Sequence, residues 1–237
     1  MDYWQMRNNV VADVATNKPV NKSWFISFMA AFFVVWIVRA TLLYSIDLAI
    51  PEGAPRQIYS DVLRVTLWVL PVFAYLQFID RVPALAYLKL NSRSSRKALL
   101  EACALIVAYF TVSVILEYLV KGRTLFHPVG SERLMQIALG LPCAPVAEEI
   151  LFRGFVLRKI GSYMTFWKAN LITALLFTSV HWPNWLFTKG FQSEVAINSV
   201  SVFILACFLG FLVRKTNSLW PAIGAHALNN LISFLLA

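Results

Sequence analysis

The chain has 237 residues, of which 59% are hydrophobic and only 14% are Asp, Glu, Lys or Arg. Soluble globular domains are usually about 25% charged, so this composition excludes an ordinary water-soluble domain and indicates the lipid bilayer as the main partner. The formal net charge of +9 would suit nucleic acid only on a soluble fold with a basic face. We therefore expect no nucleic-acid partner and attribute the charge to the basic cytoplasmic loops of a membrane protein.

Seven apolar stretches approach the roughly 20 helical residues needed to cross a hydrocarbon core. In chain order they are residues 24–46, 61–79, 98–120, 134–157, 166–182, 195–213 and 219–236. Backbone groups in lipid must form their hydrogen bonds within the segment, so each stretch is predicted to be a helix. The sequence predicts an all-α, multi-pass transmembrane helical bundle with about seven spans.

The loops between these stretches predict the orientation. With the N-terminus inside, the inner segments hold 13 Lys and Arg residues, when Lys168 at the inner end of the fifth stretch is included, and the outer loops hold 5, as the positive-inside rule requires. Residues 1–23 are then a polar cytoplasmic tail, residues 24–129 the N-terminal transmembrane helices, and residues 130–237 a helical core. No cleavable signal pattern opens the chain, and we expect a prokaryotic plasma (inner) membrane.

Ionisable residues stand inside the fourth stretch, although each costs about 2.5–3.5 kcal/mol within a membrane helix. Glu149 and Arg153 are four positions apart, in the favourable order for an intrahelical ion pair. Glu148 is rotated by about 100° from Glu149 and has no cation on its own helix. It is therefore free to face a cavity as a general base. The alternative is that both acids pair with basic groups elsewhere.

Two further polar pairs share helix faces in the later stretches. Phe177 and His181 are four positions apart, as are His226 and Asn230, so each pair points to one side of its helix. His181 could instead be a satisfied interfacial residue, and His226 and Asn230 could simply form interhelical hydrogen bonds. At about 1.5 Å of rise per residue, however, these residues and Glu148 reach a similar depth, which favours one shared cavity.

Such a set can activate water at a carbonyl. Glu148 would accept the proton of the water, and His181 would help to hold that water. His226 and Asn230 would donate hydrogen bonds to the developing oxyanion. No serine or cysteine lies in a convincing setting for a nucleophile.

The three motifs E-E-x-x-x-R, F-x-x-x-H and H-x-x-x-N, in this order, resemble the CAAX protease and bacteriocin-processing family of intramembrane proteases, which includes type II CAAX prenyl endopeptidases. The segments "APVAEEILFRGFVL" and "NSLWPAIGAHALNN" carry the same resemblance, which covers about residues 130–237. It implies an all-α endopeptidase that cleaves a membrane-associated or lipidated protein or peptide. Its catalytic residues would be Glu148, His181, His226 and Asn230, supported by Glu149, Arg153 and Phe177.

The resemblance leaves the cofactor open. We favour a glutamate-activated water without a metal, so no cofactor is expected. The alternative is a metal-dependent endopeptidase, in which Glu148, His181 and His226 would hold Zn²⁺.

The resemblance also leaves the substrate open, since prenylated C-terminal peptides, leader peptides and membrane-anchored proteins all suit the family. The alternative function is a non-proteolytic membrane protein of the same fold, such as an immunity factor or a binding scaffold. A proton-coupled transporter would have matching polar helices in both halves, whereas here the polar clusters gather in the C-terminal half.

Overall fold

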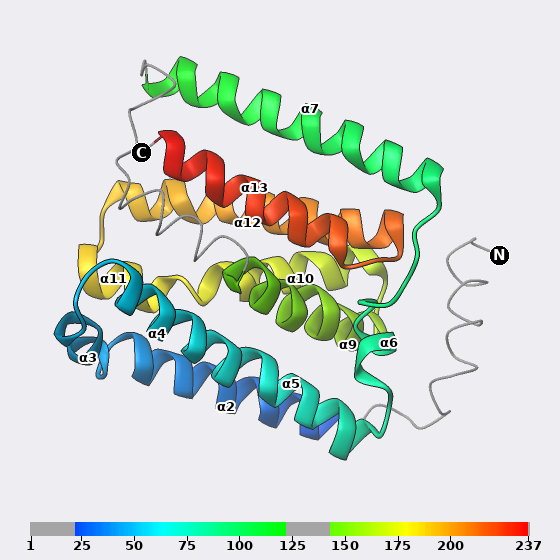
Figure 1. The fold of residues 1–237 in the computed structure, drawn as a ribbon, viewed down its shortest axis with the longest axis horizontal. Helices are drawn as coiled ribbons and strands as arrows, with labels where there is room; N and C mark the ends of the chain where they lie inside the picture. Colours follow the sequence, from blue (N-terminus) through cyan, green and yellow to red (C-terminus); the bar gives the residue numbers. More distant parts are fainter. Residues whose placement is uncertain (1–21, 122–142, 237) are drawn as a thin grey trace.

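The computed structural model describes residues 22–121 and 143–236 of the chain. Within these ranges every regular element is a helix and no strand occurs. The long helices run roughly along one common axis and form a bundle (Figure 1). The prediction of an all-α helical bundle is therefore confirmed.

The N-terminal half contains three long helical rods. The first is α2 (Lys22–Ala40), which a turn separates from the short α3 (Tyr44–Ala49). The second consists of four consecutive segments without a break, α4 (Ala54–Arg64), η1 (Val65–Val69), α5 (Leu70–Ala74) and η2 (Tyr75–Asp80). After the short α6 (Ala84–Tyr87), the third rod is α7 (Arg96–Lys121).

The C-terminal half begins with a rod in which residues 143–149 are α-helical and continue into the π-helix η3 (Ile150–Val156) and α9 (Leu157–Gly161). There follow α10 (Phe166–Ser179), α11 (Trp182–Lys189), α12 (Ser193–Thr216) and α13 (Trp220–Leu236). Pro183 explains why α10 ends at Ser179, because a proline ring clashes with the carbonyl four residues before it. His181 consequently lies at the junction between α10 and α11.

Four described helical stretches are long and apolar enough to cross a membrane. They are Lys22–Ala40, Ala54–Asp80, Arg96–Leu116 and Ser193–Thr216, and they overlap the expected spans 24–46, 61–79, 98–120 and 195–213. The first expected span was too long, because the helix already ends at Ala40.

The other three expected spans have different outcomes. The span 166–182 was also too long, since α10 has 14 residues and ends at Ser179. The expected span 219–236 corresponds to helix α13, which has 17 residues. The expected span 134–157 lies partly outside the described residues, so the number of seven spans stays a prediction.

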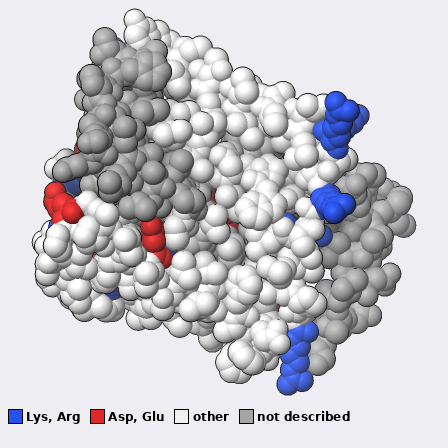
Figure 2. Space-filling view, viewed as in Figure 1, with Lys and Arg blue, Asp and Glu red and all other residues white. Residues whose placement is uncertain are grey.

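The middle of the bundle presents an apolar surface. Large hydrophobic side chains on the long helices are exposed, among them Ile26, Val107 and Ile204, which is the pattern expected when lipid replaces water. On the face that Figure 2 shows, most of the visible Lys and Arg surface lies at one end of the molecule, Asp and Glu lie toward the other end with a little basic surface beside them, and few charges lie between. The described structure therefore has the surface of a membrane protein.

The rod that contains η3 forms the centre of the core. Leu151, Phe152 and Phe155 have exposed fractions of 0%. Phe152 packs edge-to-face against Trp68 of η1 and against Phe177 of α10. Both halves of the chain therefore pack directly around η3, and residues next to it can meet side chains from either half.

Candidate active site

The acidic pair stands immediately before the π-helix. Glu148 and Glu149 are the last two α-helical residues before η3 begins at Ile150. Single π-helical turns within α-helices are rare and occur frequently at functional sites. Glu149 is fully buried, Arg153 is exposed by only 1%, and Glu148 by 8%. The motif therefore places two carboxylates and a guanidinium within the core.

The expected ion pair between Glu149 and Arg153 is present, with 2.8 Å between Arg153 Nη1 and Glu149 Oε1. Arg153 Nη2 also donates to the carbonyl oxygen of Ala206 in α12, at 3.1 Å. The guanidinium lies 4.3 Å from the ring centroid of Phe177, a favourable cation–π geometry. Arg153 thus joins η3 to α10 and α12, while Phe177 supports it through its ring face.

His226 approaches both carboxylates. Its Nδ1 lies 2.8 Å from Glu149 Oε1, and its Nε2 lies 3.7 Å from Glu148 Oε2. An ionised carboxylate only accepts hydrogen bonds, so Nδ1 carries the proton and donates to Glu149. The hydrogen bond of one ring nitrogen sets the role of the other. Nε2 of His226 can therefore donate only when the ring is doubly protonated.

Glu148 lies between two cationic or potentially cationic groups from other helices. Its Oε1 is 3.8 Å from Arg64 Nε, and its Oε2 faces His226 as described. Neither distance is that of a direct hydrogen bond, and Glu148 forms none with any described residue. Its oxygens are thus available to accept a hydrogen bond from a water or a substrate. Among the described residues of its own helix, Glu148 has no cation beside it; the neighbouring cation, Arg64, comes from α4.

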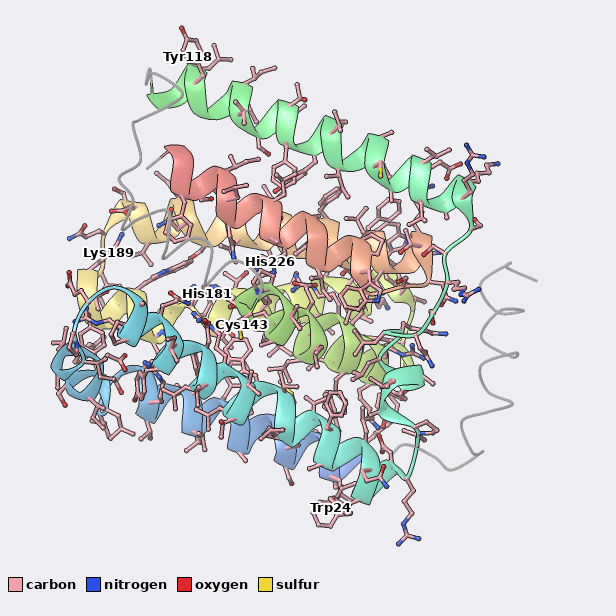
Figure 3. The ribbon with its side chains drawn as sticks, viewed as in Figure 1. Trp24, Tyr118, Cys143, His181, Lys189 and His226 are labelled. Atoms are coloured by element: carbon pink, nitrogen blue, oxygen red, sulfur yellow. The ribbon has the colours of Figure 1, made fainter. Side chains whose placement is uncertain are left out.

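His181 is held by the backbone of its own helix. Its Nδ1 lies 2.9 Å from the carbonyl oxygen of Phe177, which can only accept, so Nδ1 donates and Nε2 of the neutral ring is an acceptor. The Phe177 ring contacts both histidines, with centroid distances of 5.1 Å to His181 and 5.8 Å to His226. Figure 3 shows both histidines near the middle of the bundle.

A residue of α2 also supports the position of His181. Trp36 Nε1 donates a 2.7 Å hydrogen bond to the carbonyl oxygen of Val180, the residue directly before His181. This carbonyl lies where α10 has ended and α11 has not begun. The N-terminal half therefore helps to fix the chain segment that carries His181.

Asn230 is not joined to the other candidate residues by any contact that the structure shows. It follows His226 by one turn on α13 and is half-buried, and it makes no hydrogen bond to a described residue. The structure thus brings Glu148, Glu149, Arg153 and His226 into one contact network. It adds His181 through the Phe177 ring and leaves Asn230 at the edge.

A metal site would need three donor side chains close together. Among the described residues, no three His, Cys, Asp or Glu side chains come together in a way that could hold a metal ion. In particular, Glu148, His181 and His226 do not form such a group. The residues as arranged do not fit the alternative zinc site.

The sequence analysis did not single out Arg64. Arg64 and its neighbour Asp61 stand at the start of an apolar stretch, the same signal that singled out the acidic pair. What the sequence lacked was any indication of which helix Arg64 would face.

One family model matches the chain, over residues 130–232, and its description is "Type II CAAX prenyl endopeptidase Rce1-like". No curated protein and no solved structure matches significantly. The matched range contains all four candidate catalytic residues and the three supporting ones, whereas Arg64 lies outside it. Residues 130–232 of this chain, with the acidic pair, both histidines and Asn230, are therefore similar to the Rce1-like family of type II CAAX prenyl endopeptidases.

Proposed function

We propose that this protein is an intramembrane endopeptidase that hydrolyses a peptide bond of a membrane-associated or lipidated peptide by means of a glutamate-activated water. The family match supports a protease of the CAAX type. The single observation that carries the mechanism is the position of Glu148. Its carboxylate is buried to 8% exposure, has no direct hydrogen bond to a described residue, and faces His226 Nε2 at 3.7 Å.

Glu148 is the general base in this proposal. Its oxygens can accept the proton of a bound water, and the acceptor Nε2 of a neutral His181 can hold the second proton of that water. The Phe177 ring, which contacts both histidines, fixes the spacing of the two imidazoles. A positioned base of this kind contributes typically about 10²–10⁴-fold to a rate.

His226 is the proposed donor to the oxyanion. Glu149 accepts from Nδ1 at 2.8 Å and stabilises the doubly protonated ring, whose Nε2–H, on the side of Glu148, would donate to the oxyanion. The Asn230 amide, one turn further along α13, would be the second donor. Fixed donors aimed at a developing oxyanion in a site shielded from water are worth several kcal/mol.

The reaction then proceeds in two steps. Glu148 takes a proton from water as the oxygen attacks the scissile carbonyl carbon, and the carbonyl electrons move onto the oxygen that His226 and Asn230 stabilise. When the tetrahedral intermediate collapses, the C–N bond breaks. Glu148 returns its proton to the leaving amine, so the products are one carboxylic acid and one amine.

We propose that the activity needs no metal. The arrangement of the described His, Cys, Asp and Glu residues supports this view, since no three of them form a ligand set. No step above passes through a metal.

We further propose that the N-terminus faces the cytoplasm of a prokaryotic cell and that the chain crosses the plasma membrane about seven times. The loop bias of 13 to 5 Lys and Arg residues supports this orientation, as does the gathering of basic residues at one end of the bundle (Figure 2). Membrane-impermeant thiol labelling of single cysteines placed at the two ends would test it.

The first test is cleavage of quenched peptides in liposomes. The panel contains a peptide with an isoprenylated cysteine in a C-terminal C-a-a-X sequence and a set of unlipidated leader peptides. We expect Glu148→Ala to lower kcat/KM by about 10²–10⁴-fold and His226→Ala to lower it by a similar factor. Asp80→Asn is the matched control, because Asp80 has a similar side-chain exposure of 13% and is also ion-paired, with Lys159.

Three outcomes separate the alternatives. Cleavage that survives Glu148→Ala would refute the mechanism. A correctly folded wild type that binds these peptides and cleaves none would favour the non-proteolytic alternative, a binding scaffold or immunity factor. Activity that a strong chelator removes and Zn²⁺ restores would show a metal-dependent endopeptidase, with Glu148, His181 and His226 as the ligands to test.

A further inference from the structure

We propose that Arg64, from the N-terminal half of the chain, is a positioning residue that orients the Glu148 carboxylate for the reaction. This proposal rests on the proposed function, because it assigns a role within the same site. The family match begins at residue 130, so Arg64 is not among the residues that the family motifs cover. Arg64 of α4 enters the site through the approach of its Nε to Glu148 Oε1.

The guanidinium of Arg64 is held on one side by its own helix. Its Nη1 donates to Ser60 Oγ at 3.0 Å and lies 3.5 Å from Asp61 Oδ1. The same oxygen of Asp61 accepts a 3.0 Å hydrogen bond from Gln57 Nε2. With one edge held in this way, Arg64 presents Nε to Glu148 Oε1 at 3.8 Å. The cation is thus oriented before any substrate binds.

The place of Arg64 along its rod supports a special role. It is the last residue of α4, directly before the π-helix η1, just as Glu149 directly precedes the π-helix η3. Trp68 of η1 packs on Phe152 of η3 at 5.9 Å between ring centroids. The two π-helical segments are therefore in contact, and this contact sets the separation of Arg64 from Glu148.

The charges of the described residues around the site show what Arg64 contributes. Three carboxylates, those of Asp61, Glu148 and Glu149, stand near two guanidinium groups, those of Arg64 and Arg153. Arg153 is already engaged with Glu149 and with a carbonyl oxygen. Without Arg64, Asp61 would lose its guanidinium partner, and among the described residues Glu148 would keep only His226 as a potential cation, in a part of the molecule where uncompensated charge is costly.

The geometry also predicts what Glu148 would do in that case. The remaining donor on its other side is His226 Nε2, at 3.7 Å. A carboxylate released from Arg64 would move toward His226. It would then occupy the donor assigned to the oxyanion and at the same time leave the position of the base. The loss would fall on the chemical step, because neither group is assigned to hold the substrate in its ground state.

The kinetic test compares Arg64→Gln, Arg64→Lys and Arg39→Gln on the isoprenylated C-a-a-X peptide in liposomes. Arg39 is the matched control, since it is an ion-paired arginine of the same half with 14% side-chain exposure against 25% for Arg64. We expect Arg64→Gln to lower kcat by about 10²-fold, the usual effect of misplacing a reacting group, with KM changed less than about threefold. Arg64→Lys, which keeps the charge, should recover at least about tenfold of that loss.

A second measurement tests the contact without requiring any substrate. The unfolding of Arg64→Gln, Glu148→Gln and the double variant is followed by titration with a denaturing detergent. If the two side chains interact, Arg64→Gln should shift the unfolding midpoint less in the Glu148→Gln background than in the wild type. Fully additive shifts would overturn the contact.

The two proposals fail in different ways. Full kcat in Arg64→Gln, together with loss of cleavage in Glu148→Ala, would overturn the role of Arg64 and leave the proposed function intact. Cleavage that survives Glu148→Ala would overturn the proposed mechanism, and the role of Arg64 with it. A rise in KM at unchanged kcat would make Arg64 a substrate contact and would also refute positioning.

Discussion

Removing Arg153 should destabilise the protein more than removing any exposed cation. The Arg153 side chain is 1% exposed and pairs with the fully buried Glu149 at 2.8 Å. Its guanidinium also donates to the Ala206 carbonyl oxygen at 3.1 Å and lies over the Phe177 ring. Breaking a buried ion pair by removing one partner costs about 3–5 kcal/mol, because the other charge stays buried without compensation. We therefore expect Arg153→Met to lower the free energy of unfolding by about that amount.

The assay is reversible unfolding in a titration with a denaturing detergent, followed by tryptophan fluorescence. Lys189→Met is the control, since Lys189 pairs with Glu194 on the surface, where both side chains are about half exposed, and lies toward one end of the bundle (Figure 3). An exposed pair is worth about 0–1 kcal/mol. The double variant Arg153→Met with Glu149→Gln should recover part of the loss, because the uncompensated carboxylate is gone.

Two results would refute this reasoning. If Arg153→Met costs no more than Lys189→Met, the buried pair does not stabilise the fold. If the losses of the single variants at positions 149 and 153 add without coupling, the cost of Arg153→Met comes from lost packing and not from the uncompensated charge.

Two further predictions concern parts of the fold outside the site. Gly210→Ala should destabilise the protein by about 1–3 kcal/mol, since the added Cβ would lie 1.9 Å from Asn170 Oδ1. The control Gly224→Ala should change stability little, because a Cβ there meets nothing within 4 Å. Equal midpoints of the two variants in thermal unfolding would contradict this prediction. Burial raises the pKa of Tyr87, so the unfolded chain loses the phenol proton at a lower pH than the folded chain does. The contribution of Tyr87 to the free energy of unfolding is therefore fully present below about pH 10, the ordinary pKa of tyrosine, and is lost as the pH rises above it. Tyr87→Phe should therefore flatten the fall of unfolding free energy above pH 10, and an unchanged slope between pH 9 and 11 would show that Tyr87 does not cause it.

Local features of this protein could be predicted from the sequence because they depend on neighbouring residues. The Glu149–Arg153 ion pair needs only a helix and a spacing of four. The shared face of Phe177 and His181 has the same origin. The end of α10 at Ser179 was also readable, from Pro183, although the sequence analysis extended this helix to residue 182.

The apolar composition indicated lipid as the surroundings of the protein, and the ordered motifs carried its resemblance to a protease family, since both are properties of the residues themselves. Only the tertiary structure decided that Nδ1 of His226 donates to Glu149, 77 positions away, and that Arg64 faces Glu148. Periodicity shows which face of a helix is polar, but it does not show which other helix packs against that face. That choice depends on how the side chains of α2, η1, α10 and α12 fit around η3, and for this reason the cation beside the proposed base was found only in the folded molecule.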